Sequence, residues 1–409
     1  MTDHAQPFKI IEGGVTAPQG YRASGVAAGI KTPGAPKKDC ALIVSDRPAT
    51  VAGVFTKNLF KAPPVQWCET VCANGTARAF FDNSGNANAC TGERGLTDAK
   101  TTAQWVADGL GLTADEVCIL STGVIGVPLP MDRIQNGVAA CLEALSPTGS
   151  NDAAQAIMTT DTVKKEMAVE VAVSTGTIRL GAIAKGSGMI CPNMATMHCM
   201  MTTDAAIEAS DLKALLRKAA DESFNQICVD NDMSTSDTVL CMANGAAGLP
   251  ALTPDTPDFN VFASALTYIC RETAKNIVRD GEGATKFVEI KVTGAKTHEN
   301  ASTIARAVAV SQLCKTAFFG EDPNWGRIAC AAGYAGIGFD PDRLCIWLDD
   351  VQVMSNGMPS DFQESEAASR MKRREFQIRL EIGDGPGSAE FWTSDLSHKY
   401  VEINADYRT

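Results

Sequence analysis

Residues 167–197 read MAVEVAVSTGTIRLGAIAKGSGMICPNMATM, and they carry the strongest structural signal in the chain. Apolar residues alternate with other residues on both sides of the STG turn at 174–176, which is typical of a β-hairpin whose second strand runs to Lys185. Beyond Lys185, two glycines and a proline interrupt the backbone, so residues 186–196 fit no regular element. We therefore predict a hairpin that leads into an irregular segment held in a packed interior.

The sequence outside this hairpin predicts a mixed α and β protein. Apolar residues recur at helical spacing over 134–145 and 212–219, whereas residues 288–292 and 376–382 alternate as strands do. Because each element must bury its apolar face, we expect layers in which helices flank central sheets. At 409 residues the chain exceeds one ordinary core, so we expect at least two lobes.

Composition narrows the class of protein. The net charge of −12 argues against a nucleic-acid partner, because such partners are bound by clustered Lys and Arg. The 14 cysteines form no CxxC pair and the chain has only four histidines, so we expect reduced thiols and no zinc site. Neither a secretory leader nor a run of 18 apolar residues is present. We expect a cytoplasmic enzyme without a membrane span, a bound metal or a cofactor.

The end of the irregular segment suggests a chemical function. Oγ of Thr196 could add to the carbonyl of Ala195, and water could then cleave the ester, which leaves Thr196 as a new N-terminus. Its α-amine, with an ordinary pKa of about 7.7–8.0, would suit a general base for its own hydroxyl. Composition alone favours a simpler interpretation, in which a Gly/Pro loop leads into an apolar strand.

Six motifs together resemble the ArgJ family, the glutamate N-acetyltransferases that are also called ornithine acetyltransferases. The motifs are STGVIG at 121–126, MTTDT at 158–162, KGSGMICPNMATM at 185–197, DGEGATK at 280–286, GEDPNWGRI at 320–328 and NADYRT at 404–409. The resemblance runs from Gly14 to Thr409, and Cys191 is the one loose position of the third motif. It implies a DmpA/ArgJ-like layered α/β fold that cuts itself between Ala195 and Thr196. The products would be an α chain, residues 1–195, and a β chain, residues 196–409.

The resemblance also implies the reaction. N2-acetyl-L-ornithine would acylate Thr196 and leave as L-ornithine, and L-glutamate would then take the acetyl group and leave as N-acetyl-L-glutamate, in cyclic arginine biosynthesis. No cofactor is needed for this ping-pong transfer. The sequence leaves open whether acetyl-CoA serves as a second acetyl donor. The two fragments are expected to assemble as an α2β2 heterotetramer.

The family resemblance assigns the remaining site residues. It places the oxyanion donors at Thr122 and Gly123, in the loop that leaves the strand-like run at 117–120. The implied substrate contacts are Thr159, Lys185, Thr196, Glu282, Asn404 and Thr409. Spacing does not distinguish Thr159 from the adjacent Thr160. Because the last residue would line the site, we expect that an extension at the C-terminus is not tolerated.

Two of these contacts also have a physical rationale. Lys185 could bind a substrate carboxylate and would lower the pKa of a nearby amine, although a lysine at a strand end is otherwise an ordinary surface charge. Glu282 follows a helix that we expect to end near Arg279, with Gly281 as its C-cap. Its carboxylate could bind the cationic side chain of acetylornithine.

Other polar residues and other functions compete with this interpretation. We interpret His198 as structural. We interpret Asp230, Asp232 and Asp237 as caps and turns, because the sequence around them lacks histidine partners and calcium-loop spacing. One rival function is an aminopeptidase with an N-terminal nucleophile, which passes the acyl group to water. Another is an inactive relative whose chain is never cut.

Overall fold

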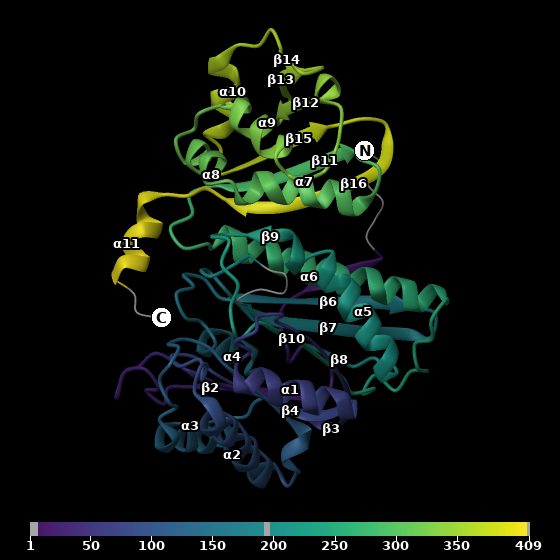
Figure 1. Cartoon of the computed structure of the whole chain (residues 1–409). Helices are drawn as coiled ribbons and strands as arrows, with labels where there is room; N and C mark the ends of the chain where they lie inside the picture. The colour runs from purple at the N-terminus through teal and green to yellow at the C-terminus, as the bar shows by residue number, and fades with distance from the viewer. Residues whose placement is uncertain (1–6, 192–196, 407–409) are drawn as a thin grey trace.

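The computed structural model describes residues 7–191 and 197–406, and Figure 1 shows two stacked sheets with helices between and outside them. This confirms the predicted mixed α and β architecture with helices flanking central sheets. The two sheets form the two expected lobes, because each packs a large apolar core, and the core of the first sheet extends to Trp392 of the second.

The first sheet has nine strands in the described part of the chain, in the order β1-β6-β7-β8-β10-β3-β4-β5, with β2 paired to β3. Its strands are β1 (Phe8–Ile11), β2 (Tyr21–Val26), β3 (Cys40–Phe55), β4 (Thr76–Asn83), β5 (Val117–Ser121), β6 (Lys165–Val173), β7 (Gly176–Lys185), β8 (His198–Thr203) and β10 (Thr238–Ala243). The predicted hairpin is confirmed as β6 and β7, which pair in antiparallel register from Val173↔Gly176 to Lys165↔Ala184.

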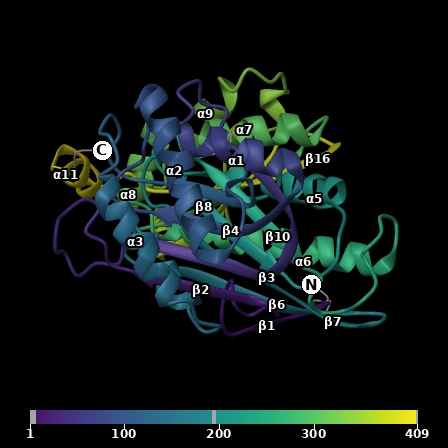
Figure 2. The same ribbon diagram turned by 90° about the horizontal axis from the view of Figure 1, so that it is seen from below.

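Helices cover both faces of this sheet. They are α1 (Pro63–Asn74), α2 (Gly92–Leu110), α3 (Met131–Glu143), α4 (Ser150–Ala156), α5 (Ala209–Asp221) and α6 (Pro257–Arg279). Figure 2 looks from below and shows α1, α2 and α3 nearest the viewer, at the end away from the second sheet. The long helix α6 lies between the sheets, and its apolar residues share one core with Trp392 of the second lobe. No helix in the described ranges is long and apolar enough to cross a membrane.

The second sheet is smaller, with seven strands among the described residues in the order β14-β13-β12-β15-β11-β16-β9. The strands are β9 (Ile227–Cys228), β11 (Phe287–Gly294), β12 (Cys345–Leu348), β13 (Val351–Ser355), β14 (Met358–Pro359), β15 (Glu375–Glu381) and β16 (Gly385–Ser394). The accompanying helices are α7 (His298–Val310), α8 (Gln312–Phe319), α9 (Trp325–Gly333), α10 (Glu364–Met371) and α11 (His398–Asp406). The strand predictions at 288–292 and 376–382 fall on β11 and β15.

The two expected fragments contribute alternately to the first sheet. Strand β8 pairs antiparallel with β7 and parallel with β10, and β10 then pairs antiparallel with β3. Strands β8 and β10 follow the predicted cleavage position, whereas β7 and β3 precede it. The expected boundary between fragments therefore runs through the middle of one sheet instead of between the two lobes.

Candidate active site

One pocket brings together widely separated parts of the chain. Among the residues that line it are seven that the sequence singled out, namely Thr122, Gly123, Thr159, Thr160, Lys185, Glu282 and Asn404. They come from the loop after β5, the loop after α4, the end of β7, the loop after α6, and α11. Ala195, Thr196 and Thr409 lie outside the residues that the structure describes.

The loop after β5 presents the two predicted oxyanion donors. The backbone N–H of Thr122 donates to the carbonyl of Asn83 at 2.9 Å, which ties the loop to the end of the neighbouring β4. Gly123 has φ of 130°, and a Cβ on it would lie 2.4 Å from the carbonyl carbon of Gly85. Only glycine therefore fits where this loop passes against the backbone of residues 85–86.

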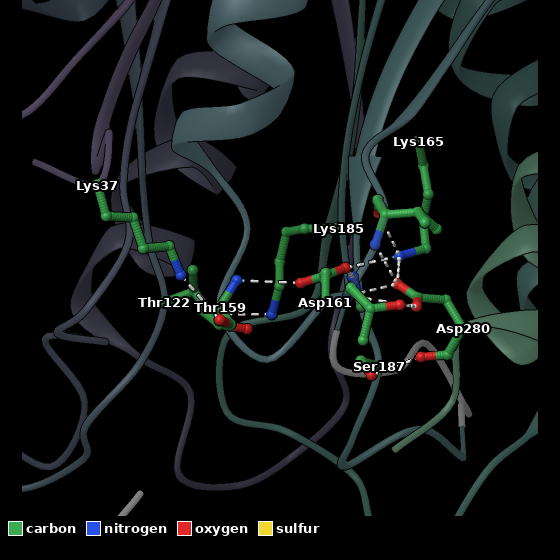
Figure 3. A network of polar contacts seen from close by, with 11 residues as sticks. Lys37, Thr122, Thr159, Asp161, Lys165, Lys185, Ser187 and Asp280 are labelled. Carbon is green, nitrogen blue, oxygen red and sulfur yellow. Dashed lines mark hydrogen bonds and ion pairs between the residues drawn. The ribbon is translucent and has the colours of Figure 1, made fainter. Parts of the chain in front are cut away.

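Lys185 is a buried cation and not a surface charge. Its residue is 3% exposed, and its Nζ donates to Thr122 Oγ1 at 3.2 Å, as Figure 3 shows. Burial lowers the pKa of Lys185, while the carboxylates of Asp161 and Asp82 oppose that shift. The competing interpretation of Lys185 as an ordinary surface lysine is wrong, because β7 ends inside the molecule and not at its surface.

Thr159 and Thr160 both line the pocket, so the choice between them stays open. The backbone of Thr159 is held on two sides. Its N–H donates to Asp161 Oδ2 at 3.0 Å, and its carbonyl accepts from Lys37 Nζ at 2.9 Å. These bonds fix the backbone of the MTTDT motif at the pocket wall.

Glu282 and Asn404 meet across the pocket. Asn404 Nδ2 donates to Glu282 Oε2 at 2.8 Å, and the backbone N–H of Glu282 donates to the carbonyl of Ser187 at 2.9 Å. Glycine permits this approach, because a Cβ on Gly188 would lie 2.3 Å from Glu282 Cδ. The carboxylate thus stands between the end of β7 and α11.

The predicted end of the preceding helix was right, but its cap was wrong. Helix α6 ends at Arg279, and Asp280 is its C-cap with φ of −100°. The left-handed glycine of this loop is Gly283, with φ of 69°, and a Cβ there would lie 2.6 Å from the backbone nitrogen of Tyr400. The close approach of α11 therefore decides where glycine is needed, and helix capping does not.

The remaining acids and His198 hold the backbone around the pocket. Asp230 accepts from the N–H groups of Met189 at 2.5 Å and Ile190 at 2.8 Å, and Asp237 accepts from that of Met197 at 3.0 Å. Both aspartates thus bind backbone amides of a segment about 40 residues away, which is not the local capping that we predicted, and Asp230 and Asp232 also line the pocket. His198 Nδ1 lies 2.8 Å from Asp82 Oδ2 in a buried pair. The described ranges contain no cluster of His, Cys, Asp and Glu that could hold a metal ion.

Sequence reasoning missed the buried ions behind the pocket. Lys165 Nζ donates to Asp161 Oδ1 at 2.7 Å and to Asp280 Oδ2 at 2.6 Å. The Asp280 carboxylate is 115 positions away in the sequence, so local patterns gave no sign of this contact. The only available signal was that both aspartates belong to motifs, MTTDT and DGEGATK. Tyr400, which also lines the pocket, gave no signal.

Comparisons with known proteins agree with the motifs. The family model described as the ArgJ family matches residues 22–409. The arginine biosynthesis bifunctional protein ArgJ of Symbiobacterium thermophilum is 50% identical over 399 residues, which cover 98% of this chain and 99% of that one. The protein of the same name from Parasynechococcus marenigrum is 48% identical over 406 residues, 98% and 97% of the two chains.

A solved structure of ornithine acetyltransferase complexed with ornithine, from Mycobacterium tuberculosis, is 42% identical and covers 45% of this chain and 98% of that one, with a TM-score of 0.42. The match to the family model spans nearly the whole chain, and the alignments with the two bifunctional relatives each cover 98% of it. On this evidence the chain belongs to the ArgJ family.

Proposed function

We propose that this protein is an acetyltransferase of arginine biosynthesis that moves the acetyl group of N2-acetyl-L-ornithine to L-glutamate. The observation that carries the proposal is the pocket itself. Five segments of the chain meet there, and each brings a residue that the family motifs assign to the oxyanion hole or to the substrate. Relatives that match over 98% of the chain are named as bifunctional proteins of arginine biosynthesis.

The charges in the pocket suit this substrate. Acetylornithine carries a carboxylate and a side-chain ammonium, and the pocket offers the Lys185 ammonium and the Glu282 carboxylate. We assign Lys185 to the carboxylate, Glu282 with Asn404 to the ammonium, and Thr159 to a further polar contact. Thr122 and Gly123 would stabilise the oxyanion of the tetrahedral intermediate, an effect of about 3–4 kcal/mol for each donor.

We propose Thr196 as the nucleophile, exposed by self-cleavage after Ala195. The residue that follows it, Met197, is held firmly, since its N–H donates to Asp237 at 3.0 Å and its carbonyl accepts from Thr238 at 3.0 Å. The next residue, His198, is the register partner of Lys185. The start of β8 is therefore anchored beside the pocket, which supports a role for the residue that precedes it.

The two fragments would stay together in an α2β2 heterotetramer in the cytoplasm, with Thr409 at the site and no cofactor. If acetyl-CoA is a second acetyl donor, the enzyme will also make N-acetylglutamate when acetylornithine is absent. An assay with acetyl-CoA and glutamate as the only substrates tests this point.

Two measurements test the central proposal. On a denaturing gel, the wild-type protein should give fragments 1–195 and 196–409, whereas Thr196→Ala should give one band at 43.1 kDa. With acetylornithine and glutamate, the wild type should release ornithine and N-acetylglutamate in equal amounts. Acetate released without N-acetylglutamate would instead identify a hydrolase, and an uncut wild-type band would identify an inactive relative.

A further inference from the structure

Three buried charged side chains form a cluster behind the pocket, which we call the buried triad: Asp161, Lys165 and Asp280. Their side chains are 0%, 2% and 3% exposed. The Lys165 ammonium lies between the carboxylates, 2.7 Å from Asp161 and 2.6 Å from Asp280, as Figure 3 shows. The reaction proposed above assigns no role to any of the three.

The two carboxylates of the triad accept hydrogen bonds from backbone amides of the pocket wall. Asp161 accepts from the N–H of Thr159 at 3.0 Å and from that of Gly186 at 2.7 Å. It therefore fixes the residue next to Lys185 and the proposed contact Thr159 at the same time.

Asp280 connects the MTTDT segment to the segment that carries Ser187 and Glu282. Its carboxylate accepts from the N–H of Thr162 at 3.1 Å and from the Thr162 hydroxyl, and its carbonyl accepts from Ser187 Oγ at 2.6 Å. The carbonyl of Ser187 accepts in turn from the N–H of Glu282 at 2.9 Å. Lys165 thus links the segments that carry Thr159, Lys185 and Glu282.

The triad also shapes the electrostatic field at Lys185. Burial lowers the pKa of Lys185, the carboxylates of Asp161, Asp82 and Asp237 raise it, and the ammonium of Lys165 lowers it. Within the triad, Asp161 and Lys165 therefore act on Lys185 with opposite signs. The Asp161 carboxyl stays ionised because Lys165, Lys185 and the Gly186 amide outweigh the effect of burial and lower its pKa to about 2.

Stability alone gives little reason for such a cluster. Taking charges out of water is costly, and well-packed apolar residues of similar volume often replace a buried ion pair without loss of stability. An apolar cluster could not accept hydrogen bonds from the backbone N–H groups that donate to the two carboxylates, and it could not maintain the electrostatic field at Lys185.

We infer that Asp161, Lys165 and Asp280 are positioning residues of the acetyl-transfer pocket, which hold its three substrate-binding segments in register and set the charge environment of the Lys185 ammonium. The inference rests on the proposed function. None of the three touches the reacting atoms, so each acts through Thr159, Lys185 or Glu282. Both kinetic and structural readouts follow from this role.

The pH profile separates this role from a merely structural one. Asp161→Asn removes a carboxylate that favours the protonated form of Lys185, so the alkaline limb of kcat/KM for acetylornithine should move to lower pH. Lys165→Met removes a repelling ammonium, so the same limb should move to higher pH. We expect both variants to lose about tenfold to a hundredfold in kcat/KM at neutral pH. Shifts in the same direction, or no shift, would overturn the inference.

Conservative and control variants complete the test. Lys165→Arg keeps the charge and should recover most of the kcat/KM that Lys165→Met loses. Lys286→Met is the control, because it removes a buried ammonium from an ion pair with Glu321, and neither Lys286 nor Glu321 lines the pocket. Lys286→Met should keep the wild-type kcat/KM for acetylornithine and its pH profile. Equal losses in Lys286→Met and Lys165→Met would reduce the triad to a structural element. If Lys165→Met does not fold, the pH profile of Asp161→Asn tests the inference alone: the alkaline limb of kcat/KM should move to lower pH, and any other result would overturn the inference.

Amide hydrogen exchange tests the positioning role of the triad without depending on the acetyl-transfer activity. In Lys165→Met, amides in residues 158–163, 185–190 and 280–284 should lose protection together, while in Lys286→Met they should not. Unchanged protection would contradict the inference even in an active enzyme. A wild type that transfers no acetyl group, yet whose segments loosen together in the variant, would overturn the proposed function and leave the coupling of the three segments established.

Discussion

The pocket end of the first sheet and the interior of the second sheet are built from opposite kinds of residue. The second sheet is filled with apolar side chains that are essentially inaccessible to water, among them Val288, Ile290, Val292, Ile378 and Leu380. At the pocket end of β6 and β7, the buried positions include Lys165 and Lys185, with Asp161 and Asp237 beside them. The side chains named in both regions are buried, but those of the second sheet are apolar and those at the pocket end are charged.

The difference separates residues that stabilise the fold from residues that serve the reaction. Apolar burial contributes about 25 cal/mol for each Å² removed from water, whereas a buried charge opposes folding unless it is paired. We therefore expect substitutions in the second sheet to lower stability and to spare the chemistry, and substitutions at the pocket to do the reverse.

The largest effect that would test this comparison is on activity. Lys185→Met should lower kcat/KM about 100-fold to 1,000-fold, because the variant loses the cation that we assign to the substrate carboxylate. Burial lowers the pKa of Lys185, so the unfolded chain binds this proton more tightly than the folded protein does. The free energy of unfolding should therefore hold or rise at neutral pH. Steady-state kinetics and urea unfolding measure the two quantities, and a large loss of stability with retained activity would break the comparison.

The second effect is on stability. Ile290→Ala in β11 removes a side chain that is 0% exposed, which should lower the free energy of unfolding by about 2–5 kcal/mol. The protein that remains folded should keep its kcat/KM. Leu313→Ala in α8 is the control, because Leu313 is 62% exposed and its truncation should change stability little. A loss of kcat/KM in folded Ile290→Ala would show that the second sheet also shapes the pocket.

The smallest effect depends on pH. Asp237 is buried, and within the described part of the chain its Oδ2 has no hydrogen-bond partner. Burial raises its pKa, so the folded state binds this proton more tightly and loses stability as the pH rises from the ordinary aspartate range to the raised value. Asp237→Asn, which can still accept from Met197, should therefore be more stable at neutral pH by about 1 kcal/mol.

The gain in Asp237→Asn should vanish below pH of about 4, where the unfolded aspartate is itself protonated. Asp258→Asn should behave in the opposite way, because hydrogen bonds from Ser174 lower the pKa of Asp258, and the variant should lose stability at neutral pH. Thermal unfolding midpoints at several pH values measure both. A destabilised Asp237→Asn at every pH would mean that the carboxylate has a partner that stabilises its charge.

The parts of the fold that were predictable from sequence are those set by neighbouring residues. The β6 and β7 hairpin, β11 and β15 followed from alternation, and the end of α6 at Arg279 followed from local signals. Sheet order did not follow, because placing β8 and β10 between β7 and β3 depends on pairings over many residues. The cap at Gly281 failed because contact with α11, far along the chain, decides the geometry of that loop.

Some features of the candidate site were likewise predictable from the sequence, and others were not. Motifs and their resemblance to one family identified Thr122, Gly123, Lys185, Glu282 and Asn404 as members of one pocket, which the structure brings together. The burial of Lys185 was not evident from the sequence, because the residues next to a lysine at a strand end do not show whether its side chain is buried. The pairing of Lys165 with Asp280 was invisible, because it exists only after the chain has folded.

The alternation of the two expected fragments within the first sheet bears on whether folding or cleavage comes first. Because β8 and β10 lie between β7 and β3, neither expected fragment contains the complete first sheet, and each needs the other to satisfy the backbone hydrogen bonds of that sheet. For the proposed cut, folding as one chain would therefore come first, and the intact peptide bond would bring the strands together. Once cut, the halves would remain interlocked, and dissociation would require two strands to leave the centre of a sheet.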